Sequence, residues 1–247
     1  MTLWPYWRAA REPRYTVLFA FPLLALYEVL AFGLAGSAFA GVRNGADVLL
    51  KTAFVGLGGR HGLAVFSLVL VGLGAWLVWR DRRIHPGPLR RSYFALMLGE
   101  SLVYAALFGG VVSGLTSLLL APPLAIVQAA ETPMRLGLGA QLVVSLGAGI
   151  YEELLFRVVL VSGLVAVGLA IGWRRPPAVG VAVVTSALIF SAFHYVGPFG
   201  DPLELGSFTF RAIAGVLFSG LYVARGFGVT AWTHALYDVG LALVVGR

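Results

Sequence analysis

The sequence predicts an all-α protein, a polytopic transmembrane helix bundle with about seven spans (six to eight). Of its 247 residues, 59% are apolar, only 12% are charged, and the mean hydropathy is +0.89. A soluble domain carries about 25% charged residues, whereas this chain repeats apolar runs close to the ~20 residues that cross a bilayer. It has no Cys, which excludes disulfide scaffolds and thiolate metal sites.

Seven apolar runs are the predicted spans. The first follows three arginines and has 25 residues, more than the ~7–15 of a signal-peptide core, so we expect it to be retained. Short segments that hold most of the charge separate the runs. In chain order the predicted spans are Thr16–Ala40, Gly62–Trp79, Ser92–Leu120, Gly137–Ile171, Ala178–Val196, Phe208–Val223 and Phe227–Val245.

The segment between the first two spans is expected to form a helix at the membrane interface. It runs over Ala46–Leu57 and places Asp47 one turn before Lys51, a spacing that favours an ion pair. No repeat and no long linker divides the chain. We therefore predict one structural unit, with N-terminal spans and this interfacial segment in residues 1–136 and a second helix bundle in residues 137–247.

Glycines are expected to control how the helices pack. Gly110 and Gly114 form a GxxxG pattern, for which we expect close packing within the bundle rather than a dimer contact. The run Gly137–Ile171 would be ~52 Å long as one straight helix, too long for a ~30 Å hydrocarbon core. We expect it to tilt, or to break near Gly147 and Gly149.

The basic residues predict the topology. They gather in short segments between spans, as at Arg80, Arg82 and Arg83, and with the N-terminus inside, the inner segments hold eleven Lys and Arg against six outside. This bias places the N-terminus in the cytoplasm. The net charge of +7 fits loops that face anionic lipid and not a nucleic-acid interface, because no basic face with interleaved aromatic residues lies outside the spans. The Arg-, Gly- and Ala-rich composition indicates a prokaryotic inner membrane.

Charged side chains inside predicted spans are candidates for a functional site, because each is costly in hydrocarbon. Glu153 and Arg157 lie one helical turn apart and are expected to form a salt bridge. Glu152 lies on another face of the same helix, outside that bridge. A buried carboxylate in such a position suits proton transfer near neutral pH.

Two further spans contribute histidines. Phe190 lies one turn before His194, and His234 lies one turn before Asp238, so that an imidazole and a carboxylate share one helical face. A carboxylate in this position fixes the tautomer of the imidazole and raises its basicity. Because three spans each carry polar groups, we expect them to converge at one polar site.

Three motifs in this order carry a family resemblance. They are EExxxR (Glu152, Glu153, Arg157), FxxxH (Phe190, His194) and HxxxN/D (His234, Asp238). Over roughly residues 137–245 the chain resembles the CPBP family, the CAAX-protease and bacteriocin-processing group of intramembrane peptidases, also called Abi. The first 130 residues match that family only in being hydrophobic. Glu153, Arg157 and Phe190 would support the site, the first two by orienting the glutamate helix.

The resemblance implies a hydrolase. Glu152 would be the general base that activates water, and His194 would hold or polarise that water. His234 and Asp238 would bind or stabilise the oxyanion of the tetrahedral intermediate, in keeping with the needs of peptide hydrolysis. Asp238 stands where the motif more often has Asn, and an ionised Asp cannot donate a hydrogen bond. Orienting His234 is therefore the role we favour for Asp238.

The need for a metal is left open by the motifs. His194, His234 and Glu152 would be the ligands of a zinc site with an open position, but the chain has no HExxH motif. We favour a glutamate-type mechanism that requires no cofactor.

The expected function is therefore an intramembrane endopeptidase that cuts a membrane-associated or lipid-modified protein or peptide within the lipid bilayer. One alternative is a proton- or ion-coupled transporter, with Glu28, Glu100, Glu152 and the histidines as a relay. Another is a non-enzymatic membrane immunity or scaffold protein, in which the polar groups only set the packing. The sequence assigns neither the substrate nor an oligomeric state.

Overall fold

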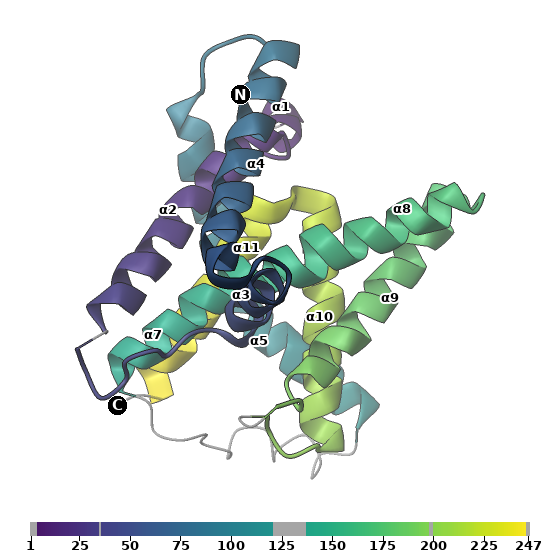
Figure 1. The fold of residues 1–247 in the computed structure, drawn as a ribbon. Helices are drawn as coiled ribbons and strands as arrows, with labels where there is room; N and C mark the ends of the chain where they lie inside the picture. Colours follow the sequence, from purple (N-terminus) through teal and green to yellow (C-terminus); the bar gives the residue numbers. More distant parts are fainter. Residues whose placement is uncertain (1–3, 35, 121–136, 198–199, 246–247) are drawn as a thin grey trace.

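The computed structural model describes residues 4–34, 36–120, 137–197 and 200–245, and every regular element in this part of the chain is a helix (Figure 1). Six helical stretches are long and apolar enough to cross a membrane, which confirms the predicted polytopic helix bundle. They are Pro13–Gly33, Gly45–Ile84, Arg91–Leu119, Leu138–Ala170, Arg175–Phe193 and Leu205–Arg225.

The helices follow the predicted spans to within a few residues at most ends. Regular elements in chain order are α1 (Trp4–Ala9), α2 (Pro13–Gly33), α3 (Gly45–Gly58), a 3₁₀ turn (Gly59–His61), α4 (Gly62–Ile84), α5 (Arg91–Leu119), α7 (Leu138–Gly147), π-helical turns Ala148–Glu152 and Leu154–Val161, α8 (Ser162–Ala170), α9 (Arg175–Phe193), α10 (Leu205–Arg225) and α11 (Phe227–Val245). The last of these has the predicted bounds, although it is not among the six candidate spans.

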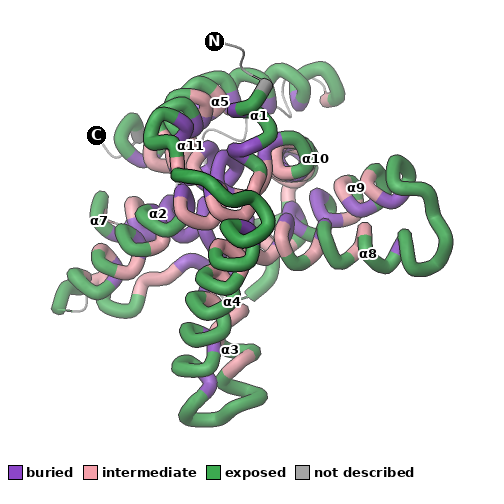
Figure 2. Tube along the Cα trace, turned by 90° about the horizontal axis from the view of Figure 1, so that it is seen from above, coloured by how far each residue is buried: buried purple, intermediate pink, exposed green. Residues whose placement is uncertain are grey.

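Helix α11 lies at the centre of the bundle. It packs against α2, α5, α7 and α10, and its small side chains Ala231 and Ala235 are buried beside Tyr27 and Tyr151. Figure 2 shows buried residues gathered in this central region, whereas α3 with α4, and α8 with α9, extend outward as two largely exposed arms. Many of the exposed side chains are large and apolar, for example Leu118 at 83%, as expected of a surface that faces lipid.

The predicted interfacial segment is helix α3. Asn44 caps its N-terminus, since the Asn44 side chain accepts a hydrogen bond from the amide of Ala46. The expected ion pair is present, with Lys51 Nζ 2.7 Å from Asp47 Oδ1. Because Asp47 is fully buried, the first turn of α3 packs into the bundle and brings the loop before it to the centre of the molecule.

The run that was expected to tilt or break is helical without interruption from Leu138 to Ala170. The two glycines before the glutamates permit close packing instead: a Cβ on Gly147 would lie 2.5 Å from Asn44 Cβ, and one on Gly149 would lie 2.5 Å from the Ala231 carbonyl oxygen. The packing expected of Gly110 and Gly114 is not found among the described residues, because no atom outside the neighbouring part of their own helix lies within 4 Å of a Cβ placed on either.

Candidate active site

The glutamate motif lies where the long helix widens into π-helical turns, Ala148–Glu152 and Leu154–Val161. Such turns are rare and are frequent at functional sites. Glu153 and Arg157 are both completely buried, and Arg157 Nε lies 3.1 Å from Glu153 Oε2. The predicted pair is therefore present.

Glu153 also holds His234, which belongs to the third motif on α11. His234 Nδ1 lies 2.7 Å from Glu153 Oε1, and an ionised carboxylate only accepts, so Nδ1 carries the proton of this hydrogen bond. Asp238 Oδ2 lies 3.5 Å from Nε2, the other ring nitrogen. The carboxylate that orients His234 is thus Glu153, and not Asp238 as the sequence suggests. Asp238 lies on the opposite side of the ring, beside Nε2.

Phe190 joins the second motif to the other two. Its ring centroid lies 4.9 Å from that of His194 and 6.3 Å from that of His234, and the guanidinium carbon of Arg157 lies 4.5 Å from the same centroid. His194 Nδ1 lies 2.8 Å from the Phe190 carbonyl oxygen, which can only accept. A neutral His194 therefore has its lone pair on Nε2, where it can accept a hydrogen bond from water.

Glu152 is buried, with 7% of its surface exposed, and has a partner that sequence reasoning missed. The amide Nδ2 of Asn44 donates to Glu152 Oε1 at 2.8 Å. Asn44 Oδ1 is held by the amide of Ala46 at 2.9 Å, so the orientation of the side-chain amide is defined and its NH₂ faces Glu152. The only sequence signal was an Asn before a helix, which indicates a cap and not a site.

The described geometry brings the predicted site residues into one region. Glu152 interacts electrostatically with both His194 and His234, and Asp238 interacts with His234 and with both glutamates. A small cavity of about 230 Å³ borders Asp238 beside Leu241 and Val144. Of the predicted site residues, only Asp238 is among the described residues that line it.

The acids that a proton relay would need are engaged elsewhere. Glu28 is ion-paired with Arg43 at 2.6 Å and with Lys51 at 3.2 Å. Glu100 accepts two hydrogen bonds from Arg225, at 2.5 and 2.7 Å. Both carboxylates are therefore ion-paired with basic side chains, and Glu28 also accepts a hydrogen bond at 2.9 Å from the hydroxyl of Tyr151, the residue before Glu152.

The candidate zinc ligands named from the sequence do not bring their donor atoms close together in this arrangement. Among the described residues, the group of three ligand side chains whose donor atoms lie within 4.8 Å of one another is Glu12, Asp81 and His85. Arg14 already pairs with both of those acids, at 2.7 and 3.5 Å. Glu152, His194 and His234 do not form such a group, although the hydrogen bonds at Nδ1 of both histidines leave Nε2 as the ring nitrogen that a metal would bind.

The comparisons with known proteins agree with the motifs. Residues 135–240 match a family described as type II CAAX prenyl endopeptidase Rce1-like, which is part of the CPBP family. No match was found among curated proteins or among solved structures. The matched segment contains all three motifs and begins just before α7. Over this segment, which is less than half of the chain, the sequence is similar to the CAAX-protease-type hydrolases of the Rce1-like group, and the six candidate spans support an integral membrane protein.

Proposed function

We propose that this protein hydrolyses a peptide bond near the lipid-modified end of a membrane-associated protein, using water that Glu152 activates. The observation that carries the proposal is the setting of Glu152. It is a buried carboxylate held by Asn44, within electrostatic reach of two histidines from two other helices. A base positioned in this way has one oxygen fixed and the other available to a water molecule.

In the proposed reaction Glu152 takes a proton from water as the water oxygen attacks the substrate carbonyl carbon. His194 Nε2 accepts the other hydrogen of the water and so orients it. His234 lies between two carboxylates, Glu153 and Asp238, and in its protonated form it stabilises the oxyanion. Glu152 then passes its proton to the leaving amine as the C–N bond breaks. The products are a new carboxyl terminus and a released short peptide.

The test uses the purified protein in detergent with a farnesylated CAAX peptide, and product masses identify the bond that is cut. We expect Glu152→Gln to lower kcat by about 10²–10⁴, the usual contribution of a general base, with little change in unfolding temperature. Glu204→Gln, a partly exposed carboxylate at the start of α10, is the matched control and should retain activity. Equal activity of both variants would refute the proposal.

A chelator arm of the same assay tests the catalytic type. We expect full activity after treatment with phenanthroline and after metal removal has been verified by elemental analysis. Loss of activity that zinc restores would replace the glutamate mechanism with a metal-dependent one at Glu152, His194 and His234.

A further inference from the structure

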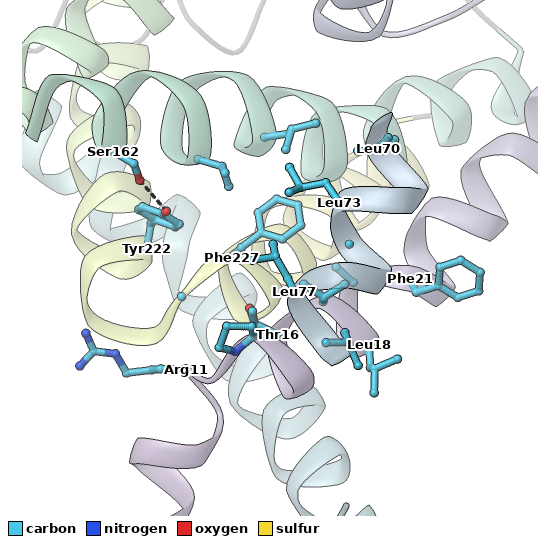
Figure 3. A pocket seen from close by; sticks show the side chains of 18 of the residues that line it. Arg11, Thr16, Leu18, Phe21, Leu70, Leu73, Leu77, Ser162, Tyr222 and Phe227 are labelled. Carbon is cyan, nitrogen blue, oxygen red and sulfur yellow. Dashed lines mark hydrogen bonds between the residues drawn. The ribbon is translucent and has the colours of Figure 1, made fainter. Parts of the chain in front are cut away.

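A second, larger cavity opens between α4 and the arm formed by α8 and α9. Its volume is about 1070 Å³, at the upper end of the ~300–1,000 Å³ that is typical of small-molecule sites. Residues of α2, of α4 and of the glutamate helix from Ile150 to Val165 line it (Figure 3). None of the side chains proposed for catalysis is among the described residues that line it.

The walls of this cavity offer hydrocarbon to an occupant. Figure 3 shows Leu70, Leu73 and Leu77 of α4 facing Phe227 across it. The hydroxyls in the walls are already used: Ser162 and Tyr222 are hydrogen-bonded to each other at 2.8 Å, and Thr16 accepts from the amide of Gly228 at 2.5 Å. A ligand in this space would therefore gain apolar burial and few hydrogen bonds.

Four arginines line the same cavity, from the α2 and α4 side and from the α9 side. They are Arg11 before α2, Arg82 and Arg83 at the end of α4, and Arg175 at the start of α9, and all four are exposed. Within the part of the chain that the structure describes, no acid pairs with any of them. The nearby acids are engaged, since Glu12 and Asp81 both bind Arg14.

The charge count places these four arginines in segments on one side of the membrane, the cytoplasmic side. An occupant must therefore combine a hydrocarbon chain with an anionic group at that side. Guanidinium groups bind phosphate through paired hydrogen bonds, and basic pockets between helices at the cytoplasmic face bind anionic lipid headgroups.

We propose that this cavity is a binding site for an anionic phospholipid of the cytoplasmic leaflet. An acyl chain lies against the leucines of α4, and the phosphate lies among Arg11, Arg82, Arg83 and Arg175. The lipid fills the space between α4 and the α8–α9 arm, which diverge from the centre of the molecule (Figure 1). A peptide substrate is disfavoured as the occupant, because none of the side chains proposed for catalysis lines this cavity.

Native mass spectrometry of the purified full-length protein tests this site. Phosphatidylglycerol and phosphatidylcholine with identical chains are titrated against the wild type and two double variants. Arg82→Gln with Arg175→Gln removes two cavity arginines. Arg80→Gln with Arg91→Gln removes the same charge from exposed arginines of neighbouring segments that do not line the cavity. Both pairs of variants can be expected to fold, because all four side chains are exposed.

We expect phosphatidylglycerol to bind at least about fivefold more tightly than phosphatidylcholine. The cavity variant should lose about 25-fold for phosphatidylglycerol, at about fivefold per arginine, and the control less than twofold. Equal affinity for the two lipids, or equal loss in both double variants, would overturn the proposal.

A third variant and a competitor complete the test. Ala75→Phe adds a ring to the wall of the cavity from an exposed position on α4 and should weaken the binding of both lipids. A farnesylated peptide, added to the Glu152→Gln protein so that it is not cleaved, should bind together with phosphatidylglycerol. Mutually exclusive binding of peptide and lipid would assign the cavity to the substrate and overturn the lipid site, whatever the result for catalysis.

Discussion

Arg157 has no exposed surface, and its guanidinium lies between the rings of Phe190 and Phe218, at 4.5 and 5.5 Å from their centroids. Its charge is balanced by Glu153, while its two terminal nitrogens have no hydrogen-bond partner among the described residues. Such a guanidinium is held by one carboxylate and by aromatic faces. Removing it leaves Glu153 with His234 as its remaining partner.

We predict that Arg157→Met lowers the free energy of unfolding by about 3 kcal/mol, because breaking a buried pair leaves one charge uncompensated. The double variant Arg157→Met with Glu153→Gln should recover at least half of that loss. Reversible unfolding in mixed micelles measures both. A single variant as stable as the wild type would show that the pair contributes nothing to the fold.

The sequence anticipated this pair and missed Asn44 for a physical reason. Glu153 and Arg157 are one turn apart, so helical periodicity alone brings them together. Asn44 reaches Glu152 across 108 residues, and no local pattern encodes such a contact. The same holds for His234. Its hydrogen bond to Glu153 spans 81 residues, whereas the sequence pointed to Asp238, on the same helix, as the partner.

At the scale of helices, the glutamate helix and α11 approach each other closely. A Cβ on Gly149 would lie 2.5 Å from the Ala231 carbonyl oxygen and 2.6 Å from Ala235 Cβ. Ala235 adjoins His234, so the spacing of the two helices sets where that imidazole lies. Hydropathy predicted the bounds of both helices well, because it depends on local composition. The distance between them depends on which glycine faces which helix, and this was not predicted.

We predict that Gly149→Ala separates these two helices, lowers peptidase activity by at least about tenfold and costs about 1–3 kcal/mol of stability, as overpacking does. Gly163→Ala is the matched control on the same long helix, because no heavy atom of the described residues lies within 4 Å of its Cβ. It should be neutral or slightly stabilising. Equal effects of the two substitutions on activity would show that close helix approach is not required.

At the scale of the whole molecule, the proposed site draws on both halves of the chain. The family match begins at residue 135, yet the donor to Glu152 comes from Asn44, and α1 is tied to the C-terminal half through Arg225, whose Nη1 donates to the Trp7 carbonyl oxygen. The N-terminal helices resembled the family only in hydrophobicity, so their contribution was visible only once the chain was folded.

We predict that Asn44→Asp lowers kcat by about 10–100-fold with little change in KM. Asp retains the oxygen that caps α3 but replaces the donor to Glu152 with a second carboxylate. Asn44→Ala should also lose activity and, in addition, lose stability with the cap. If Asn44 served only as a cap, the Asp variant would keep full activity, and kinetics of the two variants side by side decide between these roles.

The central claim is that this membrane protein cuts peptide bonds with Glu152, and comparison of peptide ends in host membranes tests it most directly. N- and C-terminal peptides are compared among cells with the wild type, with Glu152→Gln at equal abundance, and with a deletion. We predict new ends in membrane-associated proteins that occur only with the wild type. Identical ends in all three strains, with prenylated and other lipid-modified proteins detected, would contradict the claim.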